Sequence, residues 1–137
     1  MIPPHLFPLR VYYEDTDFSG VVYHASYLRF LERGRTEFIR SLGVDQAALH
    51  RETGFSFVVR RMEIDWLRPA RMDDEVVVAT LPLALKGASM LLRQEVRRGA
   101  ETLVAAQVLV AGVTGGRPAR LPAALRDRLA AFAPAGN

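Results

Sequence analysis

The sequence contains no cysteine among its 137 residues. Disulfide bonds, a cysteine nucleophile and thiolate ligands for zinc are therefore excluded. No apolar run approaches the ~18 residues of a membrane-spanning helix. The first ten residues, MIPPHLFPLR, also lack the apolar core and the small-residue cleavage site of a signal peptide. These absences predict a cytoplasmic protein with no membrane span.

Lysine is nearly absent as well, since Lys86 is the only lysine among 18 basic residues. The net charge of +3 favours an anionic partner, and the planar fork of arginine suits phosphate and carboxylate groups. We expect no nucleic-acid partner, because the basic residues are scattered and form no zinc-finger, RNP-like or basic-helix pattern. A phosphate-bearing small molecule fits the charge at least as well, and so do solvated surface arginines.

A chain of this length corresponds to about one domain, and 50% hydrophobic with 24% charged residues is typical of a globular protein. The clearest element is a helix over residues 26–42, whose apolar side chains recur at steps of three and four on one face. Gly43 follows it at the position of a left-handed cap. Gly34 lies inside the helix at a cost of about 1 kcal/mol relative to alanine, which indicates close packing there.

Beyond this helix the apolar period changes to that of strands. Turn signals such as Lys86-Gly87 and Arg98-Gly99 separate four runs of strand length. The predicted strands cover residues 55–67, 75–85, 89–97 and 102–113. Because no helical crossover lies between them, we expect an antiparallel sheet with the long helix on one face, an α+β domain over residues 1–137. Weaker signals predict a strand at 9–13, helices at 44–52 and 121–132, and irregular ends at 1–8 and 133–137.

The stretch DTDFSGVVYH, which begins at Asp15, holds two carboxylates, a glycine and a histidine. It matches the start of a calcium-binding EF-hand loop, which needs oxygen ligands at positions 1, 3 and 5 and glycine at position 6. Position 12, however, must be a bidentate glutamate and is Ser26 here. The preceding LRVYYE follows Pro8 and is predicted to be extended, whereas an EF-hand needs a helix there. Two requirements for a calcium loop therefore fail.

A transition-metal site and a plain polar turn are two further interpretations of the stretch. A metal site would use Asp15, Asp17 and His24. The other two histidines, His5 and His50, have no recognisable ligand spacing. A polar turn would need only local hydrogen bonds around Asp17. It leaves unexplained why aromatic and ionisable residues gather at the mouth of the long helix.

The fourth interpretation is a catalytic pocket. A loop that runs into a helix N-terminus presents free backbone N–H groups and the positive end of the helix dipole. Those donors can stabilise an oxyanion, and losing one typically costs about 10²–10³ in rate. A nearby carboxylate can attack directly or activate water, and general-base catalysis contributes about 10²–10⁴. Gly20 lets the loop approach a ligand closely. These parts suit acyl transfer from an activated ester.

The stretch VYYEDTDFSGVVYHASYLRFLERGRTEFIRSLG closely resembles the start of hotdog-fold acyl-CoA thioesterases. The most similar group is the Tol–Pal-associated (YbgC-type) group of the 4-hydroxybenzoyl-CoA thioesterase family. The pattern D-x-D-x-x-G-x-V-Y-H-x-x-Y, followed by E-R-x-R-T-E, carries the resemblance, which extends through FVVRRMEIDWLRPARMDDEV and the KGASM turn. It implies a curved antiparallel sheet of about five strands wrapped around a long central helix. It also implies edge-to-edge homodimers with active sites at the interface, and often homotetramers.

The resemblance assigns roles by motif position. Asp17 matches the catalytic carboxylate, as nucleophile or general base. His24 matches the residue whose backbone N–H holds the thioester carbonyl, and its imidazole is also implicated, as is Tyr13. Asp15 is expected to be structural. The substrate-binding residues expected in the same loop are Gly20, Val22 and Tyr23.

The CoA part of the substrate carries several phosphates, and no metal or further cofactor is implied. Lys86, Arg60 and Arg61 match positions that could meet these phosphates, with Ser89 as a nearby hydrogen-bond donor. Phe18 stands where the group has a small residue, so we expect it to reshape the acyl pocket. Two other functions fit the same fold: an acyl-thioester hydratase or dehydratase, and a non-catalytic acyl-carrier or complex-docking protein. Acyl carrier protein in place of CoA is also open.

Overall fold

The computed structural model describes residues 2–131. Five long strands form one antiparallel sheet in the order β1-β3-β4-β5-β2, and a two-residue strand, β6, pairs with β5. The strands are β1 (His5–Arg10), β2 (Phe55–Trp66), β3 (Glu75–Leu85), β4 (Ser89–Arg98), β5 (Glu101–Thr114) and β6 (Arg117–Pro118). Strands β1 and β2 are the edges of the sheet.

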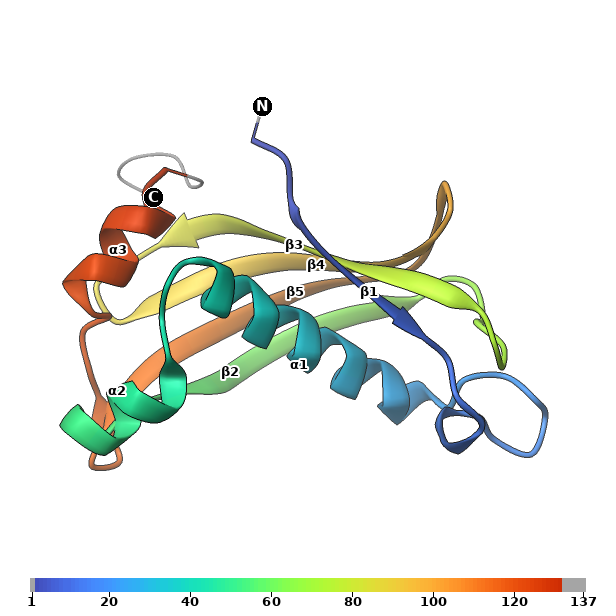
Figure 1. Ribbon diagram of the computed structural model, residues 1–137, viewed down its shortest axis with the longest axis horizontal. Coiled ribbons are helices and arrows are strands. Elements are labelled where there is room, and N and C mark those ends of the chain that lie inside the picture. The colour runs from blue at the N-terminus through green and yellow to red at the C-terminus, as the bar shows by residue number, and fades with distance from the viewer. Residues whose placement is uncertain (1, 132–137) are drawn as a thin grey trace.

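One long helix, α1 (His24–Ser41), lies across the concave face of this sheet (Figure 1). Its apolar stripe is buried and joins inward-facing strand residues in a single core cluster. The largest buried side chains of α1 are Tyr27, Phe30, Leu31 and Phe38. The curved sheet around a central helix confirms the predicted α+β hotdog architecture.

Two short helices complete the described chain. Helix α2 (Gln46–Thr53) begins where the Asp45 carboxylate accepts the Ala48 N–H, and it ends at Gly54 in a left-handed cap. Helix α3 (Ala123–Leu129) buries Leu125 and Leu129. Both lie within the predicted ranges or one residue beyond, and Phe132 of the predicted terminal helix lies outside the described residues, as does the tail 133–137.

The close packing predicted at Gly34 is confirmed. A Cβ atom added there would lie 2.4 Å from Cγ1 of Val78 in β3. Beside this contact, the buried Gln94 amide donates to the Leu31 carbonyl oxygen (3.0 Å) and to the Thr80 hydroxyl (2.9 Å). Its carbonyl oxygen accepts a hydrogen bond from Arg35 Nη1 (3.0 Å). The backbone of α1 at Gly34 therefore packs directly against the Val78 side chain of β3.

The N-terminal boundaries differ from the prediction. The first strand covers residues 5–10 rather than 9–13, so the prediction of an irregular segment 1–8 is wrong from His5 onward. Pro8 suggested irregular structure, but β1 is an edge strand, where a missing N–H faces solvent and is tolerated. Residues 13–15 instead form a 3₁₀ turn, η1 (Tyr13–Asp15). Helix α1 starts two residues earlier than expected, at His24.

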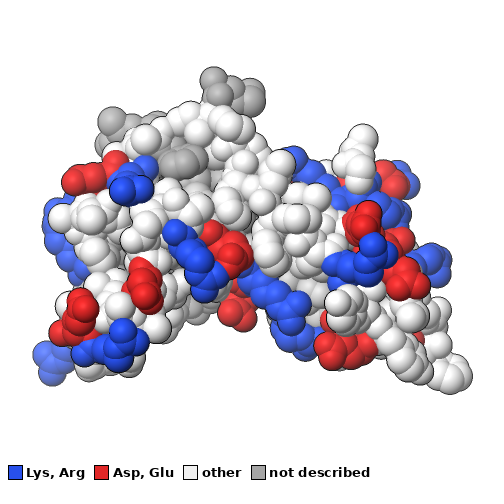
Figure 2. Space-filling model, viewed as in Figure 1, with Lys and Arg blue, Asp and Glu red and all other residues white. Residues whose placement is uncertain are grey.

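Charged side chains of both signs are mixed over the surface that Figure 2 shows, with no single basic patch on that face. Several form ion pairs, such as Arg10 with Glu75 (2.6 Å) and Arg98 with Asp74 (2.7 Å). None of the helices described between residues 2 and 131 has the length and apolar character needed to cross a membrane.

Candidate active site

The DTDFSG stretch folds into a tight turn just before α1. Asp17 N–H donates to the Val21 carbonyl oxygen (2.9 Å), and Gly20 N–H donates to the Asp17 carbonyl oxygen (3.1 Å). Thr16 and Val22 face each other in an isolated antiparallel bridge. Gly20 has a φ of 84°, which glycine adopts without strain. The turn is therefore closed by its own backbone.

Asp15 anchors this turn to the start of α1. This residue is only 8% exposed, and its carboxylate accepts the Tyr12 N–H (2.8 Å). Its carbonyl oxygen accepts the Tyr23 N–H (2.9 Å). These are the contacts of a structural residue. The chain that leads to Asp15 is a strand followed by a 3₁₀ turn, so the incoming helix of an EF-hand is missing.

Asp17 presents an ionised carboxylate to solvent. One of its oxygens accepts hydrogen bonds from the N–H (2.8 Å) and the hydroxyl (2.6 Å) of Ser19. The Ser19 hydroxyl is the main reason why the pKa of Asp17 lies below its ordinary value, and the charge of nearby His24 lowers this pKa slightly further. The carboxylate is therefore charged at neutral pH, as a nucleophile or a general base must be.

His24 is the first residue of α1, and the helix N-terminus is left uncapped. The N-cap residue Tyr23 makes no side-chain cap hydrogen bond. Its carbonyl oxygen accepts the Ser26 N–H (2.8 Å), and its own N–H is bound by the Asp15 carbonyl oxygen. Among residues 2–131, the N–H groups of His24 and Ala25 therefore stay available to a ligand. They carry the positive end of the helix dipole. This is an oxyanion-binding arrangement.

The His24 ring lies against Trp66 at the end of β2, with ring centroids 5.0 Å apart and the planes inclined at 51°. A small cavity of about 160 Å³ opens beside these two rings. It is lined by Val21, Val22, His24, Tyr27, Trp66, Leu67, Arg68 and Pro69. The cavity thus joins the loop, the helix start and the β2–β3 connection.

Tyr13, Phe18 and Tyr23 do not line this cavity and are exposed. Tyr13 and Tyr23 are 77% and 55% exposed, and Phe18 is fully exposed. Within the described residues no hydrogen bond links the Tyr13 hydroxyl to Asp17 or His24. Of the three predicted catalytic residues, the structure therefore brings Asp17 and His24 near each other and leaves Tyr13 in solvent. Phe18 lies outside the lining of the His24 cavity, so within its own chain it does not reshape this pocket.

The four residues expected to meet CoA phosphates do line one cavity, of about 540 Å³. Arg60 and Arg61 are consecutive in β2 and would normally point to opposite faces of the sheet. A bulge between Val59 and Arg61 breaks this alternation. Both arginines therefore share the cavity with Lys86 and Ser89.

This cavity lies on the outer face of the sheet. Its wall residues Ser89 and Leu91 alternate along β4 with Met90 and Leu92, which belong to the core under α1. Arg61 also lies five residues before Trp66 in β2, about 16 Å along an extended strand. Within one chain the basic cavity and the His24 cavity are therefore on opposite faces, with the β2 edge between them.

Sequence reasoning missed Trp66 and Arg68 as walls of the His24 cavity. The only signal was that the single tryptophan lies one residue before the end of the strand predicted at 55–67, and nothing in its spacing links it to the helix start. Arg68 gave no signal at all, because it is one arginine among many.

Within residues 2–131, no group of three or more histidine or acidic side chains is placed to hold a metal ion. The histidines outside the loop make other contacts. The His5 ring packs edge-on against Phe38, with centroids 6.0 Å apart. His50 Nδ1 lies 3.3 Å from the Phe55 carbonyl oxygen.

A curved sheet around one helix, with free helix N–H groups next to an ionised carboxylate, is the architecture of the hotdog-fold enzymes. The family model described as Thioesterase superfamily matches residues 19–105, and the chain belongs to this family. The predicted resemblance to hotdog-fold thioesterases is confirmed.

Individual relatives agree with this assignment. The chain is 47% identical over 111 residues to the acyl-CoA thioesterase YbgC of Haemophilus influenzae, covering 81% of this chain and 82% of that protein. It superimposes on the probable thioesterase from Bartonella henselae with a TM-score of 0.84 at 45% identity, covering 87% and 99% of the two chains. For a thioesterase from Thermus thermophilus complexed with coenzyme A and Zn, the TM-score is 0.78 at 32% identity, covering 93% and 98%.

Proposed function

We propose that this protein is an acyl-CoA thioesterase that hydrolyses an acyl thioester to a free acid and CoA without a metal or cofactor of its own. The observation that carries the proposal is the ionised Asp17 carboxylate on a turn that leads directly into the free N–H groups of the α1 start. Membership of the Thioesterase superfamily and the similarity to YbgC support hydrolysis as the reaction class.

The proposed reaction starts with the thioester carbonyl oxygen bound by the backbone N–H groups at the start of α1. Asp17 then attacks the carbonyl carbon, or removes a proton from a water molecule that attacks it. The helix N–H groups and dipole stabilise the tetrahedral oxyanion. The C–S bond breaks and CoA leaves as its thiol with a proton. Where Asp17 is the nucleophile, water then hydrolyses the acyl–Asp17 anhydride, so both routes consume one water molecule and regenerate the free carboxylate. The imidazole of His24 assists from the same helix start, whereas Tyr13 is exposed and hydrogen-bonds to neither His24 nor Asp17 within its own described chain.

We further propose that the outer cavity holds the phosphates of CoA. Arg60, Arg61 and Lys86 surround one opening with Glu63, which pairs with Arg61 (2.8 Å), so the lining keeps a net positive charge, and Ser89 adds a hydroxyl donor. Binding of coenzyme A by a relative of 32% identity supports a CoA substrate. Acyl carrier protein, whose prosthetic arm ends in the same thioester, is the other possible carrier.

Edge-to-edge pairing along β2 explains how the two cavities can serve one substrate. In the described chain β2 pairs only with β5, which leaves an open edge of twelve residues. Val58 and Val59 at this edge are 40% and 45% exposed, and an exposed strand edge is a template for pairing with a second chain. A dimer formed there would place the outer cavities and His24 sites of both chains around a common seam. We propose a homodimer of this kind, which can assemble further into a homotetramer, in the cytoplasm.

The test is steady-state hydrolysis of a panel of short, long and aromatic acyl-CoA thioesters. We expect Asp17→Asn to lower kcat by at least about 10²-fold, because the amide can neither attack nor accept the proton. Asp127→Asn, which changes the same functional group on the exposed side of α3, serves as the control. Equal rates for wild type and Asp17→Asn on every substrate would refute the role of Asp17.

The same panel separates the two other functions. A hydratase or dehydratase would change the enoyl absorbance without releasing free CoA thiol. A non-catalytic carrier or docking protein would release no thiol and would still capture its partner after the Asp17→Asn change.

A further inference from the structure

The connection between β2 and β3, residues 67–74, lies directly against the active-site loop. Arg68 N–H donates to the Leu103 carbonyl oxygen (3.1 Å) in β5, and Asp73 N–H donates to the Val11 carbonyl oxygen (2.9 Å) ahead of η1. The connection is thus attached to the sheet on one side and to the chain before the loop on the other.

Ala70, which is fully buried, links this connection to both sides of the helix start. Its carbonyl oxygen accepts the Val22 N–H (2.8 Å), and its own N–H donates to the Tyr27 hydroxyl (2.9 Å). Val22 lies two residues before His24 and Tyr27 three residues after it. The position of Ala70 therefore sets where the free N–H groups of the first turn lie.

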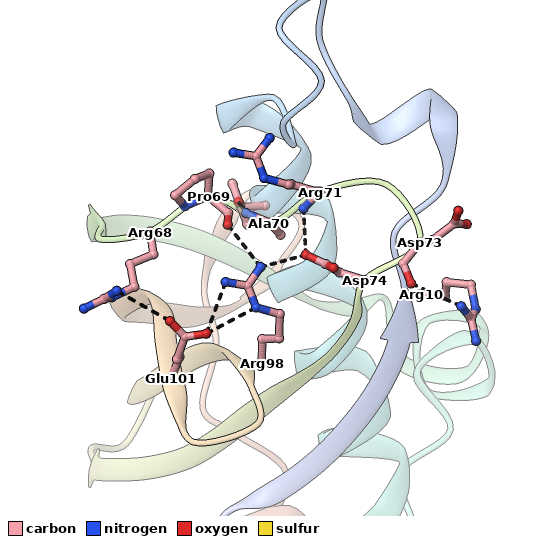
Figure 3. A network of polar contacts seen from close by, with 10 residues as sticks. Arg10, Arg68, Pro69, Ala70, Arg71, Asp73, Asp74, Arg98 and Glu101 are labelled. Atoms are coloured by element: carbon pink, nitrogen blue, oxygen red, sulfur yellow. Dashed lines mark hydrogen bonds and ion pairs between the residues drawn. The ribbon is translucent and has the colours of Figure 1, made fainter.

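Arg98, the last residue of β4, holds the residues on either side of Ala70 (Figure 3). Its Nη1 donates to the Pro69 carbonyl oxygen (3.3 Å) and to Oδ2 of Asp74 (2.7 Å). The same Asp74 oxygen accepts the Arg71 N–H (2.8 Å). One guanidinium thus closes the connection around Ala70.

A second carboxylate keeps this guanidinium in place. Arg98 Nη2 donates to Glu101 Oε1 (3.2 Å), and Glu101 Oε2 pairs with Arg68 Nη1 (3.5 Å). Arg98 and Asp74 are only 31% and 25% exposed, so solvent screens their contact less than that of the outer ion pairs. The planar fork of arginine meets all these acceptors at once, which a lysine ammonium cannot do.

We propose that Arg98 is a positioning residue of the thioesterase site, which acts through Asp74 and Ala70 to place the oxyanion-binding N–H groups of α1. This inference rests on the proposed function. Arg98 touches no substrate in this scheme. Its effect is on transition-state stabilisation, because a displacement of about 1 Å at such donors can cost 10²-fold in rate.

The test compares Arg98→Met and Arg98→Lys with Arg97→Met. Arg97 is the matched control, because it precedes Arg98 in β4 and pairs with Glu95 (2.8 Å) on the outer face. On an acyl-CoA that wild type hydrolyses, we expect Arg98→Met to lower kcat about 10- to 100-fold with little change in KM. Arg98→Lys should recover part of the loss, and Arg97→Met should stay within twofold of wild type.

Amide hydrogen exchange supplies a readout that needs no activity. We expect faster exchange at Val22 and in the first turn of α1 in Arg98→Met, with the centre of α1 unchanged. If Arg98→Met fails to fold, the same measurements on Arg98→Lys, which keeps the charge, test the proposal. The proposal is overturned if exchange at Val22 is unchanged, if kcat matches that of Arg97→Met, or if KM alone rises. Failure of wild type on every thioester, with faster Val22 exchange in Arg98→Met, would overturn the proposed function and leave the positioning role supported.

Discussion

Adding one methyl group at Gly34 tests the closest contact between α1 and the sheet. In Gly34→Ala the new Cβ would lie 2.4 Å from Val78 Cγ1, far inside the separation of about 3.5–4.0 Å at which carbon atoms attract. Val78 is fully buried, and its β-branched side chain is stiff at χ1. The methyl group therefore has to displace the helix from β3.

Two opposing terms set the size of the effect. Overpacking a core costs about 1–3 kcal/mol, whereas replacing a mid-helix glycine by alanine returns about 1 kcal/mol. Because the clash is with a side chain that cannot swing away, we expect the upper part of the first range to apply. The net loss is then about 1–2 kcal/mol of unfolding free energy. For a chain of this size that corresponds to a melting temperature lower by about 3–10 °C.

Thermal and urea unfolding at a fixed protein concentration measure this loss, and a double-mutant cycle with Val78→Ala identifies its cause. Val78→Ala removes Cγ1 and leaves the Cβ of residue 78 at 3.0 Å from the new methyl group, a contact that a small shift relieves. In that background Gly34→Ala should be neutral or stabilising by up to about 1 kcal/mol, which gives a coupling of about 1–3 kcal/mol. If the single variant Gly34→Ala is as stable as wild type, this account of the packing is refuted.

Three further predictions concern the site and its surroundings. Ser19→Ala should move the acidic limb of kcat/KM to higher pH, because the Ser19 hydroxyl lowers the pKa of Asp17. Wild-type activity is lost only as the pH falls through that lowered pKa. An unchanged acidic limb in the pH–rate profile would exclude Asp17 as the titrating group. Lys86→Met should raise KM for acyl-CoA several-fold with kcat nearly unchanged, because one of the cations around the outer cavity is lost. As the control, Lys86→Met and wild type should have the same KM for a thioester that lacks the nucleotide. Val59→Lys should shift sedimentation from dimer towards monomer, because it places a charge at the open β2 edge; a wild type that is already monomeric would refute the pairing.

Much of the fold could be predicted because local signals agree with it. The period of residues 26–42 and the turns at Lys86-Gly87 and Arg98-Gly99 give α1 and the four consecutive strands to within one or two residues. The close contact at Gly34 was also readable, because an unexplained glycine inside a helix indicates packing. The N-terminal strand was misplaced, since whether Pro8 is tolerated depends on its lying at a sheet edge, which is a property of the whole sheet.

The candidate site also has one part that the sequence predicts and one part that depends on the assembled sheet. The loop from Asp15 to His24 is contiguous, so its turn and its position before α1 followed from the sequence. The Arg98–Asp74 contact joins residues far apart in the chain, and nothing in their neighbours distinguishes them from other charged pairs. The location of Arg60 and Arg61 on the outer face depends on a β-bulge, which the sequence does not signal. Contacts set by long-range register therefore could not be predicted from local patterns, and the grouping of Arg60, Arg61, Lys86 and Ser89 was expected only from the resemblance.

The Asp17–Gly20 turn closes through its own backbone and through Ser19, and the ring of Phe18 extends from it without support from the rest of the chain. Folding consequently places no demand on the identity of residue 18. Small, large, aromatic or charged side chains can replace Phe18 without moving the neighbouring carboxylate or the helix N–H groups. Residue 18 is thus an adjustable position next to the proposed catalytic carboxylate, where the size and charge of the side chain can change without disturbing the turn.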